Sequence, residues 1–103
     1  MNCSRNDVVL LPIPFTDLTS RKVRPAVVIG RNGVDLFLVP ISSVLANTDF
    51  PLNGWRTAGL NVPCGIKAQL STVEEKLVVK IVGQLSAVDA QLLDQRLRAW
   101  LGV

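Results

Sequence analysis

The sequence predicts a mainly β protein, a small barrel or curled sheet with one helix at its C-terminal end. Two observations lead to this fold class. Several short apolar runs are separated by proline, glycine and asparagine, which is typical of strands and turns. Only the end of the chain carries apolar residues at helical spacing. With 103 residues the chain has room for one domain, which we place at residues 1–103.

The first two predicted strands are joined by a polar connection. Residues 7–13 form an apolar strand, and Pro12 indicates an edge or a bend because proline has no backbone N–H. The connection over residues 14–22 is too long for a tight hairpin. The second strand, residues 25–31, begins at Arg24-Pro25 and continues with an apolar run that is typical of a buried strand.

A hairpin follows the second strand. Asn32-Gly33 is the strongest hairpin signal in the sequence, and it leads into a third strand at residues 34–41. Counting outward from this turn, Asn32 pairs near Val34. The same antiparallel register then places Arg24 opposite Ser42, at the open end of the hairpin.

The middle of the chain is mixed. Residues 42–61 contain several turn-forming residues and predict one short helical turn or strand around Phe50 and Leu52. Residues 65–72 and 77–82 predict two further strands, and Gly83-Gln84 breaks the pattern.

The last segment is a predicted helix. Ser86 is a good N-cap, Asp89 at the third helical position resembles a capping box, and Gly102 ends the helix. Its apolar residues form one stripe at helical spacing, which we expect to face the core: Val88, Leu92, Leu93, Leu97, Trp100 and Leu101.

Composition narrows the class of protein. The hydrophobic fraction of 49%, the charged fraction of 18% and the mean hydropathy of +0.37 argue against disorder, and they suggest apolar surface at a subunit contact. The net charge of +3 permits a polyanionic partner such as RNA or DNA without identifying one. The basic residues Arg21, Lys22, Arg24 and Arg31 surround the first two strands, either as a binding surface or as ordinary solubilising charge.

Cysteine and histidine usage bounds the chemistry. Cys3 and Cys64 show no pairing pattern, the N-terminus is too polar for a signal peptide, and no apolar run is long enough to span a membrane. We therefore expect a cytosolic protein with free thiols. The chain has no histidine, which excludes Ser-His-Asp and Cys-His nucleophile systems and removes the commonest metal ligand.

Arg24 and Ser42 are the first candidates for a functional site. The predicted register brings a guanidinium and a hydroxyl within side-chain reach of each other. A planar guanidinium fork suits a phosphate or a developing anion, and a hydroxyl can donate to a further oxygen. The alternative is that both residues only flank the ends of strands.

Three motifs, taken in order, resemble the MazF/PemK toxins of type II toxin–antitoxin systems. The opening motif is Asn6-Asp7-Val8-Val9-Leu10-Leu11-Pro12-Ile13-Pro14-Phe15-Thr16-Asp17, the second is Arg24-Pro25-Ala26-Val27-Val28, and the third is Val39-Pro40-Ile41-Ser42-Ser43. The tail Gly83-Gln84-Leu85-Ser86 before the helix also fits. The resemblance covers nearly the whole chain.

The resemblance implies a homodimeric SH3-like barrel with a terminal helix, a fold that the CcdB toxins share. It implies an endoribonuclease that cleaves single-stranded RNA without a metal or cofactor. A cognate antitoxin would hold it inactive by placing an extended tail in the RNA groove. The family's arginine falls on Arg24 and its hydroxyl on Ser42.

That chemistry needs no histidine. The RNA 2′-hydroxyl attacks the adjacent phosphorus and leaves a 2′,3′-cyclic phosphate. Arg24 can neutralise the phosphorane and Ser42 can donate to another of its oxygens. We assign Arg24 an electrostatic role, because an arginine pKa of about 12.5 or above makes it a poor proton carrier.

The chain departs from the family pattern in one later strand. Some members carry Arg-x-Asp near residues 63–69, where this chain has Lys67 for the basic residue and Ala68 or Gln69 in the acidic position. A glutamine can bind a base or phosphate but cannot take a proton. Two loop residues, Asp17 and Thr16, remain as acid–base or positioning candidates, unless they only cap the loop. The expected RNA-binding residues are Arg21, Lys22, Ser43, Lys67 and Gln69.

Two other functions stay open. A CcdB-like gyrase poison would use a C-terminal tail containing tryptophan, which Trp100-Leu101-Gly102-Val103 echoes, although Trp100 continues the helical stripe. A non-catalytic barrel that only binds RNA or an antitoxin would explain the missing carboxylate. RNA base choice depends on residues 16–22 and 43–59, whose conformations the sequence does not predict.

Overall fold

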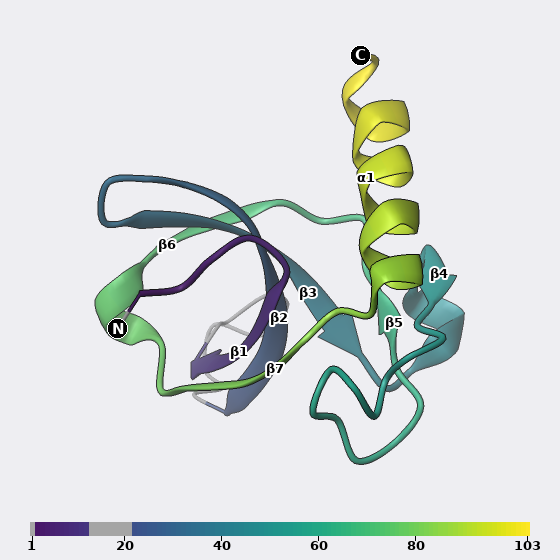
Figure 1. The fold of residues 1–103 in the computed structure, drawn as a ribbon, viewed down its shortest axis with the longest axis horizontal. Helices are drawn as coiled ribbons and strands as arrows, with labels where there is room; N and C mark the ends of the chain where they lie inside the picture. The colour runs from purple at the N-terminus through teal and green to yellow at the C-terminus, as the bar shows by residue number, and fades with distance from the viewer. Residues whose placement is uncertain (1, 13–21) are drawn as a thin grey trace.

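A computed structural model describes residues 2–12 and 22–103 (Figure 1). The described elements follow one another along the chain as β1 (Asp7–Pro12), β2 (Val23–Asn32), β3 (Asp35–Ser42), the 3-10 turn η1 (Leu45–Asn47), β4 (Phe50–Pro51), β5 (Gly65–Ile66), β6 (Ser71–Glu74), the 3-10 turn η2 (Glu75–Leu77), β7 (Lys80–Gln84) and α1 (Ala87–Leu101). The predicted mainly β fold with a C-terminal helix is confirmed. Ile13, which we expected in the first strand, lies outside the described residues.

The strands form one antiparallel sheet in the order β4-β5-β3-β2-β1-β7, with β6 also paired to β3. On one edge, β3 pairs with β2. On the other edge, its first half pairs with β6 and its last two residues pair with β5. Among the described residues the two end strands, β4 and β7, do not pair with each other, so the sheet is curled but open.

Two predicted strands have different bounds in the structure. The strand expected over residues 65–72 is two separate strands, because the chain turns between them and the Gln69 N–H donates to the Lys67 carbonyl at 2.9 Å. The strand expected over residues 77–82 begins only at Lys80, after η2. It also includes Gly83-Gln84, which we had expected to end it. Of the helical turn or strand predicted around Phe50 and Leu52, the strand is present as β4, and the 3-10 turn η1 precedes it.

The β2–β3 hairpin turns one residue later than predicted. Asn32 pairs with Asp35, and Gly33 and Val34 form the turn. Gly33 has a φ of 61° and Val34 does not have a positive φ, which is the pattern of a type II′ turn. A bulge at Ile29 then shifts the register by one, so that the ladder ends with Ala26 opposite Pro40.

The core lies on both faces of the sheet. Alternation along β2 sends Val27 to one buried cluster and Val28 to another, which explains why the apolar run is continuous. The first cluster packs under α1 through Leu93 and Leu97. Figure 1 shows α1 beside β4 and β5, with its C-terminal end projecting past the sheet.

The predicted ends of the helix are confirmed. The Ser86 hydroxyl accepts from the Asp89 N–H at 3.2 Å, and Gly102 adopts a φ of 73° as a left-handed C-cap. The apolar stripe is narrower than predicted. Val88 and Leu101 are 61% and 57% exposed. Val88 lies roughly 140° around the helix from the buried Leu93, and Leu101 is the last residue of the end that projects past the sheet.

Three further observations concern Trp100, the cysteines and membranes. Trp100 is partly buried against the core cluster under α1, as predicted. Cys3 and Cys64 are free thiols and both are buried. No helix in the described part of the chain is long and apolar enough to cross a membrane.

Candidate functional site

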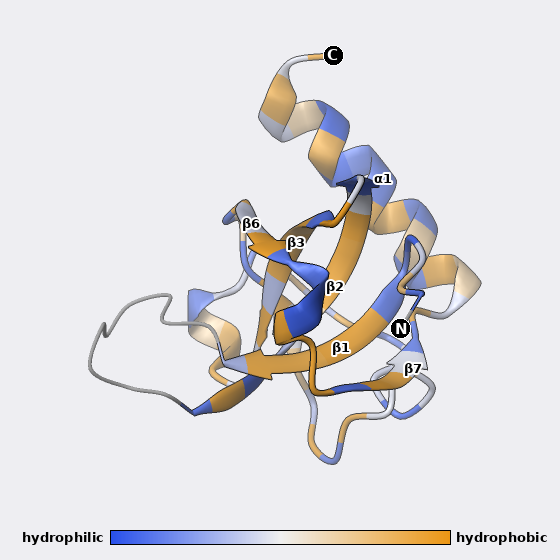
Figure 2. Ribbon diagram, turned by 90° about the vertical axis from the view of Figure 1, so that its left-hand side faces the viewer, coloured by the Kyte–Doolittle hydropathy of each residue, from blue (hydrophilic) through white to orange (hydrophobic). Residues whose placement is uncertain are grey.

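Arg24 lies near the N-terminal end of β2, where it pairs with Leu11 of β1. Its side chain is exposed, and it makes no hydrogen bond or ion pair with the described residues. Figure 2 shows this end of the sheet on the side away from α1. The guanidinium is therefore carried by a paired strand, with its charge available to an external anion.

Ser42 is the last residue of β3 and pairs with Gly65 of β5. Its hydroxyl oxygen accepts a hydrogen bond from the Val44 N–H at 3.0 Å, an interaction that fixes the start of the following turn. The hydroxyl hydrogen remains able to donate to a ligand. Ser43 is exposed directly after it.

The register relates Arg24 to Ser42. The β2–β3 ladder ends at Ala26 and Pro40, and each strand then continues for two residues to Arg24 and to Ser42. Residues two apart along a strand point to the same face, so Arg24 and Ser42 share one face of the sheet. Beyond the ladder each strand is held by its other neighbour, β1 for Arg24 and β5 for Ser42.

Lys67 lies close to the C-terminal end of β3. Its N–H donates to the Pro40 carbonyl at 3.0 Å, which places it next to the end of the β2–β3 ladder. Lys67 and Gln69 are both partly buried. They line a hollow of about 370 Å³, together with Ala46, Asn47, Thr48, Asp49 and Ala68.

Asp49 is a carboxylate that the sequence interpretation missed in this region. Its side chain is 27% exposed, and its Oδ2 lies 3.6 Å from the Arg96 Nε of α1. Its N–H donates to the Ile66 carbonyl at 2.7 Å, which holds it against β5. The Asp49 carboxylate therefore lines the same hollow as Lys67 and Gln69, although Asp49 lies 18 residues before Lys67 in the chain.

Four of the predicted site residues lie around the last residues of β3: Ser42, Ser43, Lys67 and Gln69. Arg24 lies on the neighbouring strand β2, two residues beyond the end of the β2–β3 ladder. Lys22 is exposed just before β2. The other three candidates, Thr16, Asp17 and Arg21, lie outside the described residues.

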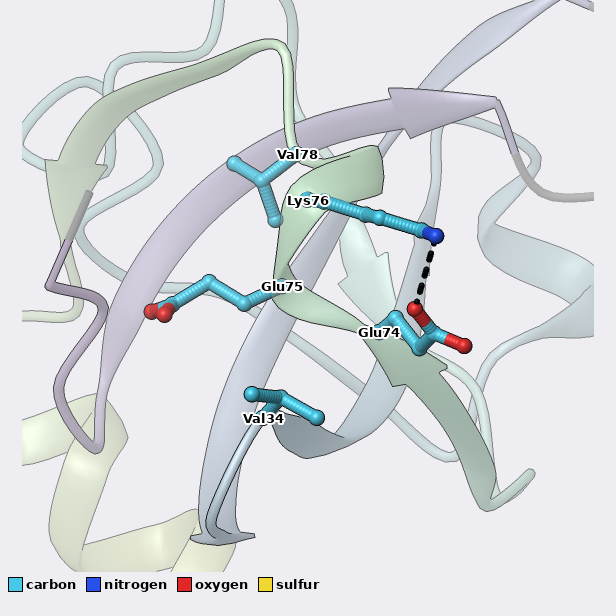
Figure 3. Close-up of a pocket in the computed structure, with 5 residues that line it drawn as sticks. All are labelled: Val34, Glu74, Glu75, Lys76 and Val78. Atoms are coloured by element: carbon cyan, nitrogen blue, oxygen red, sulfur yellow. Dashed lines mark ion pairs between the residues drawn. The ribbon is translucent and has the colours of Figure 1, made fainter.

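The turn end of the β2–β3 hairpin lies beside acidic side chains. A hollow of about 460 Å³ lies there between Val34, Val78 and η2, with Glu74, Glu75 and Lys76 around it (Figure 3). Figure 3 shows Glu74 paired with Lys76, while Glu75 points away from them. A lining with two carboxylates does not suit a phosphate.

Glu75 is held by Arg31 in a two-pronged ion pair, with its oxygens 3.0 and 3.1 Å from the two Nη atoms. It also accepts from the Cys3 N–H at 2.8 Å. The Arg31 hydrogen bonds, followed by that of the Cys3 N–H, lower the pKa of Glu75 to about 2. Arg31 was grouped in the sequence with the basic residues around the first strands. In the structure it binds Glu75 and the Cys3 carbonyl, and so holds the N-terminal segment in place.

Within the described residues, no group of three or more histidine, cysteine, aspartate or glutamate side chains is arranged to hold a metal ion. The chemistry that the described residues offer is therefore that of an exposed guanidinium, a hydroxyl, an ammonium and an amide.

Comparisons with known proteins identify the fold and the family. An endoribonuclease in complex with its cognate antitoxin, from a mycobacterial species, shares the fold with a TM-score of 0.71 and 15% sequence identity, covering 100% of this chain and 97% of that chain. No curated protein matches this sequence. A family model described as "PemK-like, MazF-like toxin of type II toxin-antitoxin system" matches residues 4–101. The chain belongs to the PemK-like, MazF-like toxins of type II toxin–antitoxin systems.

Proposed function

We propose that this protein is an endoribonuclease toxin that cleaves single-stranded RNA and is neutralised by a cognate antitoxin. The family match and the endoribonuclease with the same fold support this function. The observation that carries it is the exposed Arg24 guanidinium, which has no carboxylate partner among the described residues and shares a sheet face with Ser42.

The proposed reaction is attack of an RNA 2′-hydroxyl on the adjacent phosphorus. The 2′-oxygen bonds to phosphorus, the bond to the 5′-oxygen breaks, and a 2′,3′-cyclic phosphate is left. Arg24 donates to the non-bridging oxygens, where negative charge develops, and the Ser42 hydroxyl donates to one of them. Binding these oxygens more tightly in the phosphorane than in the substrate lowers the barrier.

The proton transfers need a group other than Arg24. One proton leaves the 2′-hydroxyl and one reaches the 5′-oxygen. Asp17 and Thr16 remain our candidates on the sequence pattern, with water as the other carrier. No metal is required, because Arg24 supplies the positive charge that a metal would otherwise bring.

The substrate strand is proposed to run across the ends of β2, β3 and β5. Lys67, Gln69 and Ser43 lie along this line, and Lys22 and Arg21 precede Arg24 in the chain. Contacts of this kind with phosphates make affinity fall as salt rises. The antitoxin is proposed to bind the same surface with an extended segment.

The protein is proposed to act as a homodimer. Apolar side chains remain exposed around a hollow of about 360 Å³ lined by Ile29, Phe37, Leu70, Ser71, Thr72 and Leu101. Leu70 is 51% exposed and Phe37 38% exposed. Apolar surface of this kind is typical of a subunit contact.

Cleavage of a long single-stranded RNA in EDTA tests the proposal. We expect products with 2′,3′-cyclic phosphate ends, and a loss of about 100- to 1,000-fold in rate for Arg24→Ala, as for other removed transition-state donors. Arg98→Ala is the matched control, because Arg98 is an exposed arginine of α1 paired with Asp94. Its rate should equal that of the wild type.

Other outcomes identify the alternatives. A folded protein that binds RNA or antitoxin but cleaves no RNA would be a binding module. Stabilised gyrase–DNA breaks without RNA cleavage would identify a gyrase poison. The partly buried Trp100, packed on the core, disfavours that function, because a poison of the CcdB type needs this tryptophan in an accessible tail.

A further inference from the structure

We propose that the hollow around Asp49 is a base-reading subsite that selects guanine in single-stranded RNA. The inference rests on the proposed function, since it names the base that the same RNA-binding surface prefers. The hollow has a volume of about 370 Å³. That volume lies within the range of roughly 300–1,000 Å³ that is typical of small-ligand sites.

The position of the hollow connects it to Ser42. Ser42 pairs with Gly65, and Gly65 lies against Thr48, one of the lining residues. Adjacent strands lie about 4.8 Å apart, so the hollow begins roughly one strand spacing beyond Ser42, on the side away from Arg24. A strand whose phosphate lies at Arg24 and Ser42 brings a neighbouring base to this hollow.

The lining is polar on several sides. Asp49 offers a carboxylate, Asn47 and Gln69 offer amides, and Lys67 offers an ammonium. Among the described residues, no hydrogen bond occupies the side chains of Asn47, Lys67 or Gln69. These groups are available to a ligand.

The Asp49 carboxylate determines the choice of base. The Arg96 guanidinium lies 3.6 Å from Oδ2, which is outside normal hydrogen-bond length, so the carboxylate keeps acceptor capacity. A carboxylate only accepts, and it can receive two parallel N–H bonds. Guanine is the one standard base with two adjacent donors on its Watson–Crick edge, N1–H and N2–H. Adenine, cytosine and uracil each place an acceptor beside a donor there, and that acceptor would face the carboxylate.

The remaining groups complete the recognition of guanine. Its O6 atom can accept from an amide N–H of Asn47 or Gln69. Lys67, a point charge beside the row of Arg24 and Ser42, is suited to a phosphate rather than to a base. Base choice and general affinity therefore depend on different side chains.

Binding of short oligonucleotides tests this assignment without requiring cleavage. The probes are seven-nucleotide strands in which every sugar is 2′-deoxyribose, so that no 2′-hydroxyl nucleophile is present. The central base is guanine, hypoxanthine (the base of inosine), adenine or uracil, and all other bases are uracil. We expect the guanine strand to bind wild-type protein roughly tenfold or more tightly than the adenine and uracil strands. Inosine lacks the N2 amino group and should fall between them.

Variants separate base reading from general affinity. Asp49→Asn should abolish the preference for guanine and leave binding of the all-uracil strand unchanged. Lys67→Met should weaken binding of every strand equally. Asp94→Asn is the matched control, because Asp94 is a carboxylate on α1 away from the hollow, paired with Arg5 and Arg98. It should keep the preference.

Two results would overturn the inference. One is a wild-type protein that binds the four strands equally or binds none of them. The other is an Asp49→Asn protein, with unchanged thermal unfolding, that retains the guanine preference. Guanine-selective binding without any RNA cleavage would refute the proposed function and leave the subsite intact. Cleavage without base preference would do the reverse.

Discussion

Gly65 lies so close to Thr48 that no side chain fits between them. A Cβ atom on Gly65 would stand 2.5 Å from the Thr48 Oγ1 and 2.7 Å from the Phe50 carbonyl oxygen. Both distances are below any normal contact. This close approach packs the segment before β4 against β5, the strand that pairs with Ser42. It therefore fixes how far the hollow around Asp49 lies from Ser42.

Gly65→Ala should therefore destabilise the protein. The added methyl group must displace backbone, which costs about 1–3 kcal/mol for overpacking of this kind. Gly30→Ala is the control, because a Cβ there meets only the Phe37 ring at 3.6 Å, an ordinary contact. Urea unfolding measures both changes. Equal stability of the two variants would show that the Thr48 segment can move away from β5.

Local signals predicted the fold where one or two residues determine the backbone. Gly33 supplies the positive φ of a hairpin turn, and Ser86 and Gly102 cap the two ends of α1. The apolar run of β2 predicted burial on both faces, because only a strand covered on both sides needs no polar alternation. These features depend on the residues themselves and little on distant partners.

The positions of the site residues depend on pairing between segments that are distant in the sequence, which local sequence patterns do not predict. The count from the turn predicted Arg24 opposite Ser42. The observed ladder ends two residues earlier, at Ala26 opposite Pro40, and its register there matches that count because the bulge at Ile29 offsets the later turn. Asp49 reaches the hollow of Lys67 and Gln69 through a backbone bond to Ile66, and nothing near Asp49 in the sequence indicates that partner. The sequence therefore does not predict that Asp49 lies beside Lys67 and Gln69.

Asp89 is expected to hold residues 53 and 54 in place. Its carboxylate is 1% exposed and accepts from the Asn53 N–H at 2.9 Å and the Gly54 N–H at 2.8 Å, in place of closing the predicted capping box. Asp89→Ala leaves two inward donors unpaired and should cost about 2 kcal/mol or more. Asp94→Ala removes an exposed carboxylate and should cost much less. Urea unfolding compares them, and similar losses would contradict a bridging role for Asp89.

The ion pair of Arg31 and Glu75 should make stability depend on acid pH. The pKa of Glu75 is lowered from 4.5 to about 2 in the folded protein, so the folded state favours the charged carboxylate. The stabilisation is present above the unfolded pKa and is lost as pH falls through the folded pKa. The difference in unfolding free energy between wild type and Glu75→Gln should therefore shrink between about pH 4.5 and pH 2. Glu74→Gln serves as the comparison, because Glu74 forms its ion pair with the exposed Lys76. An identical pH dependence in that variant would assign the effect to another group.

Arg24→Lys separates the geometry of the guanidinium from its charge at the proposed catalytic site. Lysine keeps the positive charge on β2 but lacks the planar fork that donates to two phosphate oxygens together. We expect the RNA cleavage rate to fall well below that of the wild type, while the dependence of RNA binding on salt stays similar. Arg24→Ala should lose both the rate and part of the salt dependence.

Ser42→Thr provides the matching change on β3. Threonine retains a hydroxyl that can accept from the Val44 N–H and donate to the phosphorane, and its branched Cβ suits a strand. Ser42→Thr should therefore cleave RNA at a rate close to that of the wild type, whereas Ser42→Ala, measured with the same single-turnover assay, should be slower. If Arg24→Lys and Ser42→Ala both cleave as fast as the wild type, the reaction takes place elsewhere on the protein. If only Arg24→Lys is slow, the Ser42 hydroxyl serves to fix the turn at Val44 and Arg24 alone binds the reacting phosphate.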